Sequence, residues 1–297
     1  MKVIFHTGVH CTDDKRILGC LRRNARTWRP EGIAIPEIHI YRQFLSDAVN
    51  RIGAASPAQD VRDILIDAFL PDDAEPLDRL VLSHENFFCV PKLMFSGGRI
   101  YRKAEARLST MARIFAQDEV ELFLGLRDPA SFLPAAFAAT PTQNFTEFMC
   151  GLDAMQFRWS DLIRRLRADV PEVPITLWCN EYTPFIWGQV IREMAGIEMS
   201  RKIVGAFDIF ASIIKPEGMR RFRAFLHANP NLSETQKRRV MVAFLDKYAR
   251  AEAIEEELNL PGWDEALIDR LSAQYEEDIA SISHIPGVRI IEPWDAA

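Results

Sequence analysis

Three groups of polar residues in this sequence could bind an anion or transfer a proton. They are the loop Gly8–Lys15, the pair His84 and Glu85, and Arg127 with Ser131. Amides at a helix N-terminus attract an anion, a histidine or a carboxylate can act as a base, and the planar guanidinium of arginine can bind a phosphate through two hydrogen bonds. Each group follows or directly adjoins a short apolar run that predicts a strand. We therefore expect the groups near the carboxyl ends of strands, where open α/β sheets bind their ligands.

The elements that must position these groups are strands separated by helices. Apolar runs predict strands at residues 2–5, 79–83, 119–126 and 175–179, and a short final strand at 287–291. Helical patterns begin at residue 15 and recur at 37–52, 58–68, 104–117, 130–138, 157–168 and 184–196. Residues 27–35 contain Pro30 and Gly32 and are predicted to be a loop. This alternation predicts an α/β fold with a mostly parallel sheet that helices cover on both faces.

The C-terminal third differs because helical patterns dominate it. Helices are predicted at residues 222–228, 234–257 and 263–281, and the last two are long and strongly charged. We therefore divide the chain into an α/β core at residues 1–200 and a helix-rich region at 201–297. This region either forms a subdomain or lid beside the sheet or completes the core of one domain.

The composition is that of a globular protein with no general affinity for nucleic acid. Of the 297 residues, 48% are hydrophobic and 26% are charged, and the net charge is −6. A nucleic-acid-binding protein would show a basic face instead. The basic clusters Arg220–Arg223 and Lys237–Arg239 are interpreted as solvated helix faces, with local anion sites as the alternative.

The sequence also predicts a cytoplasmic protein without a membrane span. Met1 and Lys2 lead directly into the first strand without a signal peptide, and no apolar run approaches the roughly 20 residues that span a bilayer. The five cysteines are scattered, odd in number and without metal-ligand spacing, so we expect free thiols and no metal. Three histidines at loop ends are interpreted as hydrogen-bonding residues and not as metal ligands: His6, His10 and His84.

The segment from His6 to Lys15 resembles the loop with which bacterial sulfotransferases bind the 5′-phosphosulfate of their donor, PAPS. That loop typically reads His-x-Gly-x-x-Lys-Thr-Gly-Thr-Thr, and His6, Gly8 and Thr12 match it. Cys11 stands in place of the family lysine, Asp13 in place of the glycine, and Asp14 and Lys15 in place of the two threonines. The resemblance assigns donor contacts to Gly8, Val9, His10, Cys11, Thr12, Asp13, Asp14 and Lys15.

The other two groups resemble further motifs of the same family, in the same order. The family carries its general base after a comparable strand, as histidine in some branches and glutamate in others, so the resemblance implies His84 or Glu85. Arg127 matches the arginine that holds the 3′-phosphate of the donor. The serine expected eight residues later is Ala135, and Ser131, one turn earlier, is its substitute. Glu181 lies in a strand-then-Glu segment and is predicted to bind loop amides or helix ends.

The resemblance implies a three-layer, P-loop-like fold and, as activity, transfer of a sulfuryl group from PAPS to a hydroxyl or amine. The acceptor would be a sugar or another small metabolite, and no metal would take part. The alternative is a catalytically degenerate homologue that binds a glycan, another anion or a protein. A nucleotide-kinase-like phosphotransferase is a weaker third hypothesis, because the Walker lysine is missing.

Each group also has a purely structural interpretation. Asp13 and Asp14 could cap the helix after the loop themselves and repel a phosphate. His84 could stabilise a loop, and Arg127 could pair with Asp128 or another carboxylate.

Overall fold

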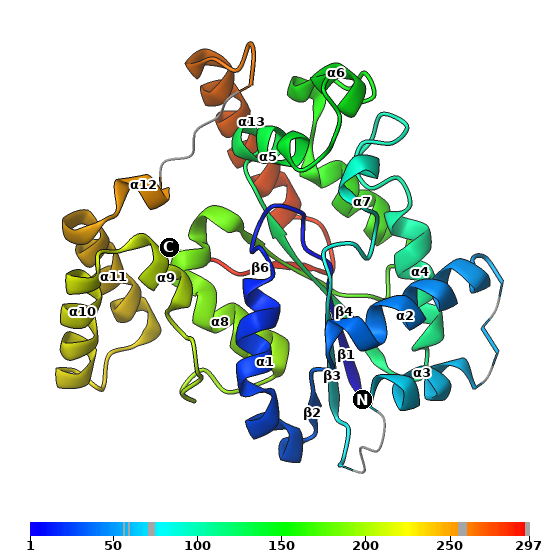
Figure 1. Ribbon diagram of the computed structural model, residues 1–297, viewed down its shortest axis with the longest axis horizontal. Helices are drawn as coiled ribbons and strands as arrows, with labels where there is room; N and C mark the ends of the chain where they lie inside the picture. The colour runs from blue at the N-terminus through cyan, green and yellow to red at the C-terminus, as the bar shows by residue number, and fades with distance from the viewer. Residues whose placement is uncertain (56, 59, 71–74, 255–259, 295–297) are drawn as a thin grey trace.

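A six-stranded sheet forms the middle layer of the protein, and all of its strands are parallel. The computed structural model (Figure 1) describes residues 1–297 except 56, 59, 71–74, 255–259 and 295–297. The order of the strands is β2-β3-β1-β4-β5-β6. Their bounds are β1 Lys2–His6, β2 Ile33–Ala34, β3 Arg79–Ser83, β4 Glu119–Leu126, β5 Ile175–Cys179 and β6 Val288–Ile290. The predicted α/β class is thereby confirmed, and the sheet is parallel throughout.

Helices cover both faces of the sheet, as the apolar strands require (Figure 1). One face carries α1 Arg16–Trp28, α8 Thr183–Ala195 and α9 Asp208–Ile213. The other carries α2 Ile38–Ile52, α3 Val61–Phe69, α4 Ala104–Ile114, α5 Pro129–Ala138, α7 Trp159–Asp169 and α13 Glu265–Ser283. In β1, Ile4 packs on the first face while Val3 and Phe5 pack on the second. All three are fully buried, which explains why this run is apolar without alternation.

The stretch at residues 27–35 is not entirely a loop, because it contains the edge strand β2. A short 3₁₀ helix, Arg29–Glu31, ends at Gly32, whose φ of 81° lies in the left-handed region that glycine favours. The next two residues pair with Arg79 and Leu80 of β3. A strand of two residues is too short to leave a pattern in the sequence, so the prediction of a continuous loop was wrong here.

The C-terminal third contributes both to a separate helical cluster and to the main core. Helices α10 Pro216–Ala228 and α11 Glu234–Tyr248 pack on each other and on α9 around their own small apolar cluster. Helix α13 returns to the sheet, packs on α5 and α7, and leads into β6 beside β5. Figure 1 shows the α10–α11 hairpin at one side of the molecule and α13 over the sheet.

The long helix predicted at residues 234–257 is interrupted. Helix α11 ends at Tyr248, and a short helix, α12 Ala251–Ile254, follows. Between them, the carbonyl of Tyr248 accepts from the amide of Lys215 at 2.8 Å, and the amide of Arg250 donates to the carbonyl of Ile213 at 2.9 Å. These bonds to a distant segment replace helical ones, which sequence periodicity could not reveal. The predicted residues 255–257 lie outside the described part of the chain.

The connections of the central strands diverge around the carboxyl end of β1. The chain leaves β1 for α1 on one face, whereas it leaves β3 and β4 for α4 and α5 on the other. Open α/β sheets bind ligands at such a point, because the diverging loops leave room between them. The three groups of polar residues lie at or beyond these strand ends.

Candidate functional site

Strand β1 ends at a buried histidine that is tied to strand β3. His6 is in register with Ser83, and its Nδ1 lies 2.7 Å from the Ser83 hydroxyl. Tyr41 of α2 fixes Ser83 in turn, because its hydroxyl donates to the Ser83 carbonyl at 2.6 Å and accepts from the Ser83 amide at 3.0 Å. Burial lowers the pKa of His6, and the nearby carboxylate of Asp13 opposes that shift. The Nε2 atom of His6 has no hydrogen-bond partner within the described residues.

The loop after β1 continues along strand β4 before it turns to α1. The Val9 amide donates to the Gly125 carbonyl at 3.3 Å, and the Gly125 amide donates to the Gly8 carbonyl at 3.2 Å. Gly8 has a φ of 91°, and a Cβ there would lie 3.4 Å from the Cα of Glu85. Glycine is therefore needed at this position, both for its conformation and because the loop packs directly against the segment after β3.

Asp13 caps the first turn of α1. Its Oδ2 accepts from the Ile17 amide at 2.9 Å, and its backbone carbonyl accepts from the Arg16 amide at 2.8 Å. The self-capped helix is thus what the structure contains, and a carboxylate already occupies the position that an anion would take. Lys15 points to the neighbouring segment, with its Nζ 3.7 Å from Oε1 of Glu85. Asp14 is exposed and lies 3.8 Å from the guanidinium of Arg16.

Arg127 joins the loop to the start of α5. Its Nη1 donates to the carbonyl of Cys11, and its Nε donates to the Ser131 hydroxyl at 2.9 Å. Ser131 and Arg127, which the resemblance assigns to the 3′-phosphate of the donor, thus bond to each other. Asp128 instead caps α5, because its Oδ1 accepts from the Ala130 amide at 2.8 Å. Cys11 supplies no positive charge to the loop, and burial raises its thiol pKa to about 11.

His10 is buried in the loop between two polar side chains. Its Nδ1 lies 2.8 Å from the Tyr101 hydroxyl, and its Nε2 lies 2.8 Å from Oδ1 of Asn86. The hydroxyl of Thr12 also stays within the loop, donating to the Val9 carbonyl at 2.6 Å. Tyr101 and Asn86 were not predicted to belong to the site. Asn86 directly follows Glu85, but Tyr101 comes from a distant turn and gave no signal in the sequence.

The hydrogen bond of His84 determines which of its ring nitrogens carries the proton. The backbone amide of Asn86 donates to Nδ1 of His84 at 2.9 Å, so Nδ1 is an acceptor and the neutral ring carries its proton on Nε2. Burial lowers the pKa of His84 to about 4, and the positive charges of Arg42 and Lys15 add to the shift. At neutral pH the side chain therefore presents an N–H group at Nε2 and no free lone pair there.

Little space remains between the loop and the segment after β3. The hollow at this point measures about 10 Å³. Its walls are His6, Asp13, Lys15, Leu18, Ile38, Ser83, His84 and Glu85. Such a volume is close to the minimum for one water molecule. The hollow itself is therefore too small for a phosphosulfate group.

Glu181, which follows β5, binds loop groups as predicted. Its Oε1 accepts from the Asp128 amide at 2.8 Å, and its Oε2 accepts from the Tyr275 hydroxyl at 3.3 Å. Burial raises the pKa of this carboxyl. Glu181 thus connects the end of β4 to α13, which is a structural function.

Neither a metal site nor a membrane helix is found in the described part of the chain. Its His, Cys, Asp and Glu side chains form no group of three or more that could hold a metal ion. None of its helices combines the length and the apolar character that crossing a bilayer demands. Comparison with known proteins adds no assignment, since no family model and no curated protein sequence matches the chain.

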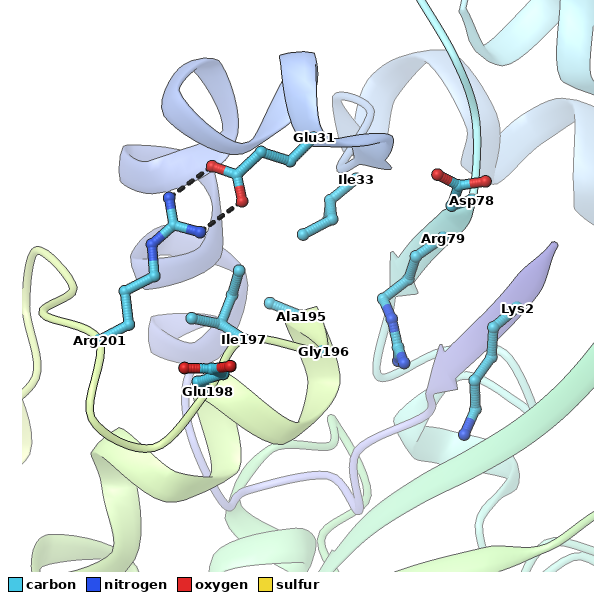
Figure 2. A pocket seen from close by; sticks show the side chains of 10 residues that line it. All are labelled: Lys2, Glu31, Ile33, Asp78, Arg79, Ala195, Gly196, Ile197, Glu198 and Arg201. Carbon is cyan, nitrogen blue, oxygen red and sulfur yellow. Dashed lines mark hydrogen bonds and ion pairs between the residues drawn. The ribbon is translucent and has the colours of Figure 1, made fainter.

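A larger cavity of about 480 Å³ lies at the opposite, amino-terminal edge of the sheet (Figure 2). Figure 2 shows Arg201 facing Glu31, with both side chains joined by two hydrogen bonds. Lys2 and Arg79 approach from the first residues of β1 and β3, and Lys2 pairs with Glu121 at 2.6 Å. The three cationic residues that line this cavity, Lys2, Arg79 and Arg201, are matched by three acidic ones, Glu31, Asp78 and Glu198. The equal numbers of positive and negative side chains indicate a structural role for this cavity, and so does its distance from the carboxyl ends of the strands.

Proposed function

We propose that this protein is a catalytically degenerate homologue of PAPS-dependent sulfotransferases that acts as a binding module. The observation that carries the proposal is the hydrogen bond from the Ile17 amide to Asp13. The helix N-terminus that would bind the donor's phosphosulfate holds a carboxylate of the chain itself. Because two negative groups repel each other at this short range, the donor would have to displace Asp13.

The charges around the loop support the same conclusion. Sulfuryl transfer builds negative charge on the bridging oxygen as the S–O bond breaks, and a positive group must stabilise that charge. Cys11 is a neutral thiol at the lysine position, and Lys15 lies beside Glu85. The guanidinium of Arg127 is turned to the loop carbonyl of Cys11 and to Ser131.

The proton position on His84 argues against its use as a base. A general base needs a free lone pair that faces the acceptor hydroxyl. The Nδ1 lone pair of His84 is taken by the Asn86 amide, and Nε2 carries the proton. Glu85 keeps a carboxylate that could serve as a base, but it also neighbours Lys15.

The second candidate function is the active sulfotransferase, acting on a hydroxyl or amine of a sugar or small metabolite. The observation in its favour is that the loop Gly8–Lys15 contacts both the segment after β3 and Arg127. Lys15 approaches Glu85 at 3.7 Å, and Arg127 binds the carbonyl of Cys11. In this case Arg127 and Ser131 would hold the 3′-phosphate of PAPS, the loop would hold the phosphosulfate, and His84 or Glu85 would accept the proton.

Titration with adenosine 3′,5′-bisphosphate, the product of the donor, distinguishes the two functions. We expect no thermal stabilisation of the full chain at millimolar ligand, because Asp13 holds the helix N-terminus. A bound ligand at a hundred times its Kd would stabilise the fold by about 2.7 kcal/mol, which a thermal shift detects readily. Stabilisation that disappears in Arg127→Gln would contradict the proposal and favour the enzyme.

A double variant tests whether Cys11 and Asp13 are the residues that prevent the donor from binding. Cys11→Lys with Asp13→Gly restores the family residues at both positions. We expect this variant, unlike the natural chain, to be stabilised by the bisphosphate. Cys150→Lys is the matched control, because Cys150 is exposed and remote from the loop in sequence. A double variant that folds and still fails to bind would count against the family resemblance itself.

A further inference from the structure

A cavity of about 660 Å³ separates helix α8 from the C-terminal helical hairpin of α10 and α11. Figure 1 shows the α10–α11 hairpin at one side of the molecule and α8 beside α1. The volume lies within the range of small-molecule sites in proteins, roughly 300–1,000 Å³. Its walls come from α8, from the segment 199–208, from α10 and from the start of α11.

The charges that line this cavity are predominantly positive. Five of the lining residues are Arg or Lys, namely Arg192, Lys202, Arg223, Lys237 and Arg238, and two are acidic, namely Asp208 and Glu234. Both acidic side chains already have cationic partners, since Asp208 pairs with Arg23 and Glu234 lies 2.7 Å from Lys237. This excess of positive charge contrasts with the cavity of Figure 2, which positive and negative side chains line in equal number.

Arg192 is the strongest indication of an anion site, because its guanidinium is buried beside the cavity. It is 8% exposed, and its Nε donates to the carbonyl of Arg201 at 2.8 Å and its Nη1 to the carbonyl of Gly188 at 2.9 Å. Within the described residues, no carboxylate lies within 4.0 Å of Arg192, Lys202 or Arg223. Burial lowers the pKa of Arg192, and the carboxylate of Glu234, which already pairs with Lys237, only opposes that shift from beyond 4.0 Å. A buried guanidinium with no carboxylate in direct contact is stabilised by a counter-ion that reaches it.

Part of the remaining wall is apolar, which restricts the kind of anion that fits. Phe185, Phe207, Leu226 and Met241 line the same space. Arginine binds tetrahedral oxyanions with its planar fork, and the rings and aliphatic side chains would cover an apolar body. From this combination we propose that the cavity binds a small organic anion that carries a phosphate or sulfate group on an apolar moiety.

The inference is independent of the proposed function, since none of the three residues that carry it lies in the loop or beside Arg127. It also favours one of the two interpretations that the sequence left open for the cluster Arg220–Arg223. Of the cluster Arg220–Arg223, Arg223 lines the cavity, whereas Arg221 pairs with Glu217 on the surface. One member of the cluster therefore belongs to a local anion site and another to a solvated helix face.

Calorimetric titration of the full chain with phenyl phosphate at low ionic strength tests the proposal. We expect saturable binding that Arg223→Gln and Lys202→Gln each weaken about tenfold, the usual loss for a charge-assisted hydrogen bond. Arg220→Gln is the matched control, because it removes the same charge from the same exposed helix without lining the cavity. Equal weakening by Arg220→Gln, or no binding at about 10 mM, would overturn the proposal.

Two further ligands test the two parts of the proposed chemistry. Inorganic phosphate should bind about tenfold more weakly than phenyl phosphate, and benzyl alcohol should not bind, because the site needs both the charge and the apolar body. Equal affinity for the two phosphates would overturn the apolar part. Binding of adenosine 3′,5′-bisphosphate that survives Arg127→Gln but is lost in Arg223→Gln would belong to this cavity, which separates the present test from that of the donor site.

Discussion

Asp13 controls the chemistry of the candidate site at the scale of a single residue. Where a glycine would leave the α1 amides free, its carboxylate accepts from the Ile17 amide at 2.9 Å. The same bond that stabilises the helix removes the anion site, since an N-terminal amide serves a cap or a ligand and not both.

Asp13→Ala should lower the free energy of unfolding by about 0.5–2 kcal/mol, the usual cost of losing an N-terminal cap. Asp13→Asn should lose less, because its side-chain oxygen can still accept from the Ile17 amide. Urea unfolding measures both. Asp14→Asn, which alters an exposed neighbour, is the control. Equal losses in all three variants would mean that Asp13 does not cap the helix.

His84 couples the stability of the fold to pH. Its pKa is about 4 in the folded chain against an ordinary value of 6.5. Between these values the unfolded chain binds a proton that the folded chain does not, so stability falls as the pH is lowered from about 6.5 to 4. The loss should be on the order of 2 kcal/mol, since the group is partly solvated.

His84→Gln should flatten this pH dependence. Unfolding midpoints in urea measured between pH 7 and pH 4 would show it. Part of the slope should remain, because burial lowers the pKa of His6 in the same direction. An unchanged slope in the variant would show that His84 is as easily protonated in the folded chain as in the unfolded one.

At the scale of elements, the α10–α11 hairpin forms a unit of its own. Phe222 is fully buried in its small cluster, where its ring lies 5.0 Å from that of Phe210 and 5.6 Å from that of Phe244. The cluster of which they are part is separate from the two that pack on the sheet. Elements with few buried contacts to the main core open at a lower free energy than central strands.

Phe222→Ala should therefore destabilise this hairpin locally by about 3–5 kcal/mol, the range for truncating a buried aromatic ring. Amide hydrogen exchange should speed up in α10 and α11 and stay unchanged in β1 and β4. Phe225→Ala, at a site 39% exposed on the same helix, should cost about 1 kcal/mol or less. Faster exchange in the central strands as well would show that the hairpin and the sheet unfold together.

At the scale of the whole molecule, the C-terminal third completes the sheet. Strand β6 pairs with β5, and α13 packs on α5 and α7, where Tyr275 and Ile282 are buried in the main core. A core that ended at residue 200 would leave one edge of the sheet and part of one face exposed.

A fragment of residues 1–200 should accordingly fail to fold cooperatively. We expect no sigmoidal urea transition and strong binding of a hydrophobic dye, because the apolar surface that α13 covers is open to solvent. The full chain under identical conditions is the reference. A sharp transition in the fragment would instead mark residues 1–200 as a domain that folds alone.

The fold class and most of the elements could be read from the sequence because they depend on local patterns. Unbroken apolar runs such as residues 119–126 mark strands buried on both faces, and helical periodicity marks the helices between them. The positions of His84, Arg127 and the loop followed from the same reasoning, since each lies at or after the end of a predicted strand. The exceptions include β2 and the end of α11, where bonds to distant residues decide the structure. They also include α9, which was not predicted, and the first turns of α10, which begins at Pro216 and not at residue 222.

The sequence by itself determined which side chains stand at the strand ends, because chain order and apolar patterns place them there. Only the tertiary structure decided what those side chains do. Arg127 reaches across to Cys11, 116 residues earlier in the chain, and Lys15 approaches Glu85 of another strand end. The bonds of Asp13 to Ile17 and of Asn86 to His84 are local, but the fold decided which of the interpretations left open by the sequence is correct. The excess of positive charge between α8 and the hairpin was equally hidden, because Arg192, Lys202 and Arg223 meet only when separate helices pack. Hydrogen bonds and electrostatic fields depend on distances of a few ångströms, and the folded chain sets those distances between residues that are remote in the sequence.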